Sequence, residues 1–381
     1  MNKKIISFIR NKFKSEDFIP LHVPTFNGNE KKYLNECIDS TYVSSVGPFV
    51  DKFEELMNTI TQTKKTTAVV NGTAGLQVAL RLVGVEKDTE VITQALTFVA
   101  TANAIAYNNA HPIFLDVDID TMGLSPKAVS DFLNEFGELR EDGCYNKRSG
   151  RRIAACMPMH TFGFPVHLDE LIKVCKLWEI PIVEDAAESL GSEYNGKPTG
   201  SFGEVGAFSF NGNKIVTCGG GGAIVTKNIE LGERAKFLTT TAKEPHPYEY
   251  IHSELGYNFR MPNVNAALAC AQLEQLTGFL ENKRILAKKY ETFFDSQGIK
   301  FRTENPGTKA NYWLMCVELE DKQERDLFLK STNDSQVMTR PIWQLMSRLP
   351  MYKDCQKDKQ LNALFLEERI VNIPSSVRLI K

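Results

Sequence analysis

The feature that most constrains this chain is a regular alternation of short apolar runs with longer helical patterns in its first half. Strand-like runs recur at residues 66–71, 90–93, 112–117, 153–157 and 182–184, and helical patterns lie at 74–83, 98–107 and 168–178. Consecutive strands separated by helices pair in parallel, with the helices packed on the faces of the sheet. The pattern therefore predicts an α/β fold with a mostly parallel sheet.

The second half of the chain has a different organisation. Strand-like runs at 205–210 and 223–226 flank four glycines at 219–222, and a long helical pattern covers 264–294. The last part mixes strand patterns (313–318, 336–339) with a helix (322–330), while the polar stretch 136–151 is expected to be a loop. We therefore expect a large domain over residues 1–250 and a smaller C-terminal α/β domain over residues 251–381.

Composition excludes several classes of protein. The formal net charge of −2 provides no strong field for nucleic acid or an anionic membrane, and no apolar run approaches the roughly 20 residues that span a bilayer. Residues 1–14 are basic but lack the apolar core of a signal peptide. The eight cysteines are scattered without a CxxC pair, which is typical of reduced thiols in a cytoplasmic protein and argues against a zinc site.

Two residues point to a specific cofactor. Asp185 ends a predicted strand, at the sheet edge where open α/β sheets bind ligands, and Lys214 follows the apolar run 205–210 just before the glycines. A lysine amine for a Schiff base and a carboxylate for a ring nitrogen are what pyridoxal 5′-phosphate (PLP) requires. Glu184 and Glu188 are alternatives to Asp185. Because side chains alternate along a strand, only one of Glu184 and Asp185 can face a cofactor. Either of these two residues would also serve as a plain helix cap.

Other residues suit the same cofactor. Gly72 and Thr73 join a predicted strand to a helix, where free backbone N–H groups bind phosphate, although Thr73 would also serve as an ordinary helix cap. Ser209 would add a hydroxyl, and Phe98 an aromatic face for the cofactor ring; both also suit packing roles. His160 follows an apolar strand, where it would line the site or pack in the core.

The glycine run does not match a dinucleotide site. That site needs GxGxxG between a strand and a helix, whereas residues 219–222 precede a strand. A hairpin bend or close backbone packing is expected instead, which disfavours a nicotinamide oxidoreductase.

Four stretches together resemble the DegT/DnrJ/EryC1/StrS family of PLP-dependent nucleotide-sugar aminotransferases, over about residues 24–374. They are NGTAGLQVAL (71–80), VITQALTFVATANAI (91–105), VEDAAESLGSEYNGKPTGSFGEVGAFSFNGNKIVTCGGGGAIVT (183–226) and GYNFRMPNVNAALACAQLE (256–274). The resemblance implies the fold-type I architecture, with a mostly parallel seven-stranded sheet in the large domain and a smaller C-terminal α/β domain. It also implies a homodimer with shared active sites.

The resemblance further implies residue roles. Lys214 would be the Schiff-base lysine and Asp185 the partner of the pyridine nitrogen, with Glu188 near the phenolic oxygen and Phe98 stacked on the ring. The phosphate cup would comprise Gly72, Thr73, Ala74 and Ser209, and Asn258 would reach the phosphate in the neighbouring subunit. The sequence departs from the family at residues 219–222, where an acidic residue often stands among the glycines.

The run 340–352 is similar to a narrower branch that makes 4-amino sugars on the legionaminic acid and bacillosamine pathways. The implied reaction is transamination of a UDP- or GDP-linked 2-acetamido-2,6-dideoxy-4-keto-hexose, with L-glutamate as amino donor. Arg340 would bind the diphosphate and Trp343 would stack, although a surface ion pair and a core position are the plain alternatives. Amination at C3, a PLP-dependent dehydratase and a catalytically silent sugar-nucleotide-binding relative stay open.

Overall fold

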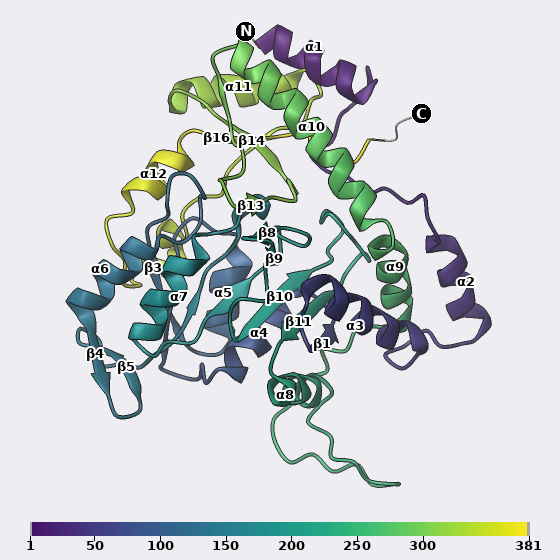
Figure 1. The fold of residues 1–381 in the computed structure, drawn as a ribbon, viewed down its shortest axis with the longest axis vertical. Coiled ribbons are helices and arrows are strands. Elements are labelled where there is room, and N and C mark those ends of the chain that lie inside the picture. The colour runs from purple at the N-terminus through teal and green to yellow at the C-terminus, as the bar shows by residue number, and fades with distance from the viewer. Residues whose placement is uncertain (1, 379–381) are drawn as a thin grey trace.

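A computed structural model describes residues 2–378 and contains a continuous seven-stranded sheet (Figure 1). Parallel bridges from Cys156 to Ile182 and from Met159 to Asp185 join its two hydrogen-bonded halves. In spatial order the strands are β1 (Lys65–Val69), β11 (Gly222–Thr226), β10 (Val205–Ser209), β7 (Val183–Asp185), β6 (Ile153–Met157), β2 (Glu90–Gln94) and β3 (His111–Leu115). Only β11 runs antiparallel to the others, so the predicted, mostly parallel sheet is confirmed.

Helices cover both faces of this sheet because its strand residues alternate between two apolar surfaces. Along β1, Val69 joins the cluster that includes Leu76 and Leu238, whereas Ala68 joins the cluster that includes Phe53. The first face is covered by α4 (Gly72–Leu82), α5 (Val99–Tyr107) and α8 (Ile229–Thr239), and the second by α3 (Pro48–Thr61) and α9 (Asn263–Leu273). Near β3 and β6, the sheet also packs against α6 (Pro126–Phe136) and α7 (Leu168–Leu177).

A second, antiparallel sheet lies in the C-terminal part of the chain, toward the top of Figure 1. Its strand order is β12 (Lys300–Phe301), β14 (Met315–Glu318), β16 (Ile370–Ile373) and β15 (Arg340–Pro341). Around it lie α1 (Asn2–Phe13), α10 (Leu276–Ser296), α11 (Lys322–Asp334) and α12 (Leu361–Glu367). The domain boundary near residue 250 stays a prediction.

Smaller elements complete the chain. They are α2 (Glu30–Asp39), the hairpin of β4 (Gly137–Arg140) and β5 (Gly143–Asn146), and the small sheet of β13 (Thr308–Lys309), β8 (Glu193–Tyr194) and β9 (Lys197–Pro198). The structure forms this hairpin where the sequence predicted a loop over 136–151. Its first strand, β4, is charged and mostly exposed, whereas β5 is uncharged and half-buried, so neither strand has the apolar pattern that would have predicted it. Of the strand predicted at 336–339, only a bridge between Val337 and Ile19 forms, and β15 begins at Arg340.

The single helix predicted over 264–294 is two helices, α9 and α10, separated by Glu274 and Gln275. Both side chains bond to the N-terminal part of the chain: Glu274 accepts from Asn29, Tyr33 and Lys52, and Gln275 donates to Glu30. These partners are distant in sequence, and their bonds stabilise the break between the two helices. The helical spacing of apolar residues does not reveal them.

Two findings bear on the compositional expectations. Each of the eight cysteines is unpaired, and seven of them are buried. Within residues 2–378, no helix combines the length and the apolar character needed to cross a membrane.

A buried lysine in α10 provides a test of this packing. Lys283 is fully buried, and its ammonium donates to the carbonyl of Ser375; burial, with the charge of Arg378, lowers the pKa of Lys283 to about 7 from 10.5. The unfolded chain therefore holds more protons than the folded chain above pH 7, so this group makes stability rise with pH toward 10.5.

We expect Lys283→Met to flatten this rise in denaturant unfolding between pH 6.5 and 9.5, whereas Lys289→Met, a change in the same helix, should keep the wild-type slope. An equal slope in both variants would contradict the lowered pKa of Lys283.

Candidate active site

Most of the predicted site residues line one cavity of about 590 Å³, within the size range of small-molecule sites. It opens at the carboxyl ends of β7 and β10 and extends to the C-terminal sheet. Its lining includes Asn71, Gly72, Thr73, Phe98, Asp185, Glu188, Ser209 and Lys214 from the large-sheet part, and Trp313, Arg340 and Trp343 from the C-terminal part. A larger hollow of about 710 Å³ beside Glu90 and Arg148 contains none of the predicted residues.

Asp185 is the carboxylate that β7 presents to the cavity. It is buried, its Oδ2 accepts the Thr101 hydroxyl at 2.7 Å, and its Oδ1 accepts the Ala187 N–H at 3.2 Å. Burial raises the pKa of Asp185, and the Thr101 hydroxyl opposes this rise. A cationic partner in the cavity would therefore stabilise the charged form of this carboxylate.

Glu184 points to the opposite side of β7, as strand alternation requires. Its carboxylate accepts backbone N–H groups of Gly200, Phe202 and Gly203 and lies 3.0 Å from Nε2 of His160. His160 is fully buried and absent from the cavity lining. The structure therefore places His160 in the core, and substrate contact by this residue is no longer expected.

Lys214 lies between an acid and an aromatic ring. Its Nζ is 3.4 Å from Oε1 of Glu188 and 3.9 Å from the centroid of the Trp313 ring. The other oxygen of Glu188 accepts the N–H of Phe162 at 2.9 Å, an orientation that depends on a left-handed backbone at Phe162 with φ of 56°. Burial raises the pKa of Glu188 to about 7, with the Lys214 charge opposing, so this acid can exchange a proton near neutral pH.

The N-terminus of α4 forms another wall. Asn71 caps the helix by accepting the Ala74 N–H at 2.8 Å, which leaves the first N–H groups of the helix facing the cavity. A Cβ on Gly72 would lie 2.8 Å from Cβ of Ser209, so only glycine allows this approach. Gly72, Thr73 and Ser209 therefore line one corner whose chemistry suits an anion, whereas Ala74 is absent from the lining and its N–H is already bonded.

Arg340 and Trp343 lie on the C-terminal wall. Nη1 of Arg340 bonds to Asn333 and to the carbonyl of Thr339, and the side chain stays exposed. The Trp343 ring lies 4.9 Å from Phe162 and 6.2 Å from Phe98, so an aromatic wall extends across the cavity. Both residues are free to contact a ligand.

Asn258 lies outside this cavity. Its Oδ1 accepts from Arg260, and it follows a projecting segment, residues 243–256, drawn at the bottom of Figure 1. Tyr248 and Tyr250 on this segment are each 82% exposed. Any contribution of Asn258 to a phosphate would therefore be to another copy of the chain.

Sequence reasoning missed three residues of the site. Thr101 follows Phe98 by one helical turn and so shares its face, a signal that helical spacing contains. Phe162 contributes only its backbone N–H, which bonds to Glu188, and Trp313 reaches Lys214 from a part of the chain distant in sequence. No local sequence pattern indicates either contact.

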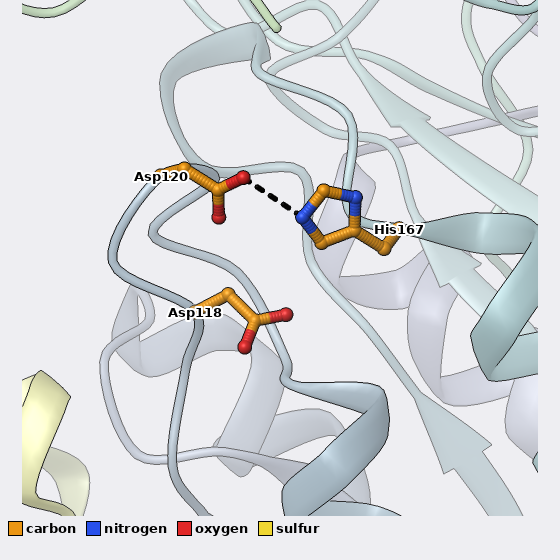
Figure 2. A group of neighbouring side chains, drawn as sticks. All are labelled: Asp118, Asp120 and His167. Atoms are coloured by element: carbon orange, nitrogen blue, oxygen red, sulfur yellow. Dashed lines mark hydrogen bonds and ion pairs between the residues drawn. The ribbon is translucent and has the colours of Figure 1, made fainter.

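A separate group of possible ligands lies away from the cavity. Figure 2 shows Asp118, Asp120 and His167, whose ligand atoms lie within 4.8 Å of one another. The carboxylate of Asp120 already pairs with His167 at 2.9 Å and accepts from Asn305 at 2.8 Å. The group therefore fastens the loop after β3 to α7 and to the segment before β13.

Comparison with known sequences defines the class of this protein. The model of the DegT/DnrJ/EryC1/StrS aminotransferase family matches residues 24–381, and the chain belongs to this family. The EpsN protein of Bacillus subtilis is 36% identical over 88% of this chain and 84% of its own. The GDP-perosamine synthase of Escherichia coli O157:H7 is 35% identical, over 94% of this chain and 93% of its own.

Solved structures agree. The aminotransferase TlmJ from Streptoalloteichus hindustanus superposes with a TM-score of 0.85 at 25% identity, over 94% of this chain and 93% of its own. The chain is thus a fold-type I, PLP-dependent aminotransferase. Its cavity fits that cofactor, because a helix N-terminus with a close glycine suits a phosphate, a buried carboxylate suits a pyridinium, and Lys214 supplies an amine.

The glycine at the helix start allows a sharp test. Gly72→Ala places a methyl group against Ser209, so we expect the affinity for PLP to fall by about tenfold or more, equivalent to a loss of ~1.4 kcal/mol. Gly212→Ala is the matched control, since nothing lies within 4 Å of a Cβ there. Absorbance titration of each apo-protein with PLP measures the affinity, and thermal unfolding checks the fold. Equal affinities in the two variants would contradict the proposed phosphate corner.

Proposed function

We propose that this protein transfers an amino group from L-glutamate to the C4 ketone of a nucleotide-linked 4-keto-6-deoxy sugar, in the biosynthesis of surface glycans that contain 4-amino or nonulosonic acid sugars. The observation that carries the proposal is the placement of Lys214, Glu188 and Asp185 on one cavity that also receives Arg340 and Trp343. The relative of 35% identity is named for a nucleotide-linked amino sugar, which supports this substrate class. The 2-acetamido-2,6-dideoxy-4-keto-hexoses linked to UDP or GDP are the first substrates to test.

The roles of the residues follow from their chemistry. PLP, when bound, supplies an electron-accepting ring that stabilises negative charge on the reacting carbon. Asp185, held by Thr101, would keep the ring nitrogen protonated. Lys214 would hold the cofactor and then remove and return the proton at the reacting carbon. Glu188, with its pKa near 7, lies 3.4 Å from Nζ and can exchange that proton at neutral pH.

The C-terminal wall would select the substrate. The planar guanidinium of Arg340 matches a diphosphate, and Trp343 offers a face for the sugar or the base. This wall lines the same cavity as Gly72 and Ser209, so we expect the substrate to lie between the cofactor and the C-terminal sheet.

Lys214→Ala tests the reaction. We expect wild-type protein with PLP to show a visible absorbance band that L-glutamate bleaches, to release 2-oxoglutarate, and to aminate the 4-keto sugar nucleotide. Lys214→Ala should lose at least about a hundredfold in turnover, in line with removal of an acid–base group, and keep its thermal stability. Lys227→Ala, a change at an exposed lysine after β11, is the control.

Other outcomes separate the rival functions. Mass and NMR analysis of the product distinguishes amination at C4 from amination at C3. Ammonia release without 2-oxoglutarate indicates a dehydratase, and sugar-nucleotide binding without any turnover indicates a silent relative. Normal turnover by Lys214→Ala would overturn the assignment of the lysine.

We further propose a homodimer in which each copy completes the other's site. Three observations support it: Asn258 lies off the cavity of its own chain, the adjoining segment projects, and that segment exposes Tyr248, Tyr250 and Leu255. Exposed aromatic residues at this density are typical of interfaces.

The projecting segment can be tested directly. Replacing both Tyr248 and Tyr250 with Ser should weaken dimerisation by about tenfold or more, since interface tyrosines are frequent hot spots. Light scattering over a dilution series measures the change. Leu177→Ser with Leu327→Ser, at two residues that are 70% and 65% exposed, is the matched control and should stay dimeric. An unchanged dissociation constant in the tyrosine variant would place the interface elsewhere.

A further inference from the structure

The amino group of Lys214 contacts two parts of the chain that are far apart in sequence. Its Nζ lies 3.4 Å from Glu188, which follows β7, and 3.9 Å from the ring centroid of Trp313, which precedes β14 of the C-terminal sheet. The Lys214 side chain is 11% exposed and Trp313 is 4% exposed. The lysine therefore lies between a carboxylate and an aromatic face with little access to water, where a cation–π contact is strongest.

The Trp313 ring is fixed in this place. Its Nε1 donates to the carbonyl of Asn213 at 2.7 Å, so the ring is bonded to the residue next to Lys214. Its backbone N–H donates to Oδ1 of Asn311 at 2.8 Å. These two bonds hold the indole beside Lys214.

Asn311 links Trp313 to the acid as well. The amide nitrogen of Asn311 donates to the carbonyls of Glu188 and Leu190, each at 2.9 Å. The two groups around Nζ are thereby linked to each other and to the lysine's own turn. The indole bonds to Asn213, and Asn311 joins the Trp313 backbone to the carbonyl of Glu188. A displacement of the segment before β14 would move the ring and the acid together.

We infer that Trp313 is a positioning residue, which holds the amino group of Lys214 beside Glu188 whenever that lysine is not joined to the cofactor. The C-terminal part of the chain then sets the place from which the lysine acts. This inference rests on the proposed function for its consequence in turnover, but the contact itself involves only residues of this chain.

The type of residue matters for two separable reasons. Trp313→Phe keeps an aromatic face but loses the bond to Asn213, whereas Trp313→Leu loses both. Trp178→Phe is the matched control, because Trp178 follows α7, packs near Gly137 and does not line the cavity.

The test measures the reactivity of Lys214 in the apo-protein. Trinitrobenzenesulfonate labelling, resolved by peptide mass spectrometry, gives the rate at Lys214 from pH 7 to 10. With the ring removed, the ammonium form loses its partner, so the profile of Trp313→Leu should shift to lower pH and its rate at pH 8 should rise about tenfold. Trp313→Phe should shift less, and Trp178→Phe should match the wild type.

A purely structural loosening gives a different result. It would raise the labelling rate equally at every pH, and other buried lysines such as Lys283 would be labelled faster too. That result, or a wild-type profile in whichever Trp313 variants fold, overturns the inference. In holoenzyme, kcat should fall by about tenfold with less than about threefold change in the KM for glutamate, since the ring acts on the lysine rather than on substrate.

Failure of the two proposals can be told apart. No glutamate-dependent bleaching in the wild type would remove the proposed function while leaving the labelling result intact. An unshifted profile at Lys214 would remove the role of Trp313 while leaving the aminotransferase reaction intact.

Discussion

The structure depends on one buried carboxylate. Asp185 ends the central strand β7, between β6 and β10, where it is buried, and this burial raises its pKa. Desolvation of a charge is costly unless partners compensate, so a hydroxyl from α5 and a backbone N–H are directed at it. The remaining capacity of the carboxylate is directed into the cavity, where we propose that it pairs with the protonated ring nitrogen of the cofactor. The sheet, α5 and the proposed cofactor site thus meet at one residue.

The C-terminal part does more than close the cavity. Trp313 lies against Lys214, Asn311 holds the backbone carbonyl of Glu188, and Trp343 extends an aromatic wall toward Phe98. Two sheets that contribute side chains to one apolar cluster therefore also share one set of reacting groups. The geometry around the lysine belongs to neither sheet alone, so the packing between them sets the chemistry.

Much of this was accessible from local patterns. Strand and helix alternation predicted the sheet, and the position of Asp185 at a strand end and of Gly72 at a helix start followed from the same patterns. Lys214 stood out because it follows an apolar strand and precedes glycines. Two features escaped these patterns for different reasons. The break between α9 and α10 rests on contacts with residues 29–52, which are distant in sequence, and β4 of the β4–β5 hairpin is charged and mostly exposed. The sequence left a site role and a core role open for His160, and its contact with Glu184 places it in the core.

The sequence by itself determined which chemical groups are present and on which element each one lies. Periods of two and of about 3.6 residues encode which side of a strand or helix a side chain occupies. Only the tertiary structure decided which of these groups meet. Glu188 rather than Asp185 is the carboxylate at Lys214, Ala74 gives its N–H to Asn71, and an indole from the other sheet covers the lysine. The reason is physical: distances between residues separated by a hundred positions are fixed by core packing, which no local period records.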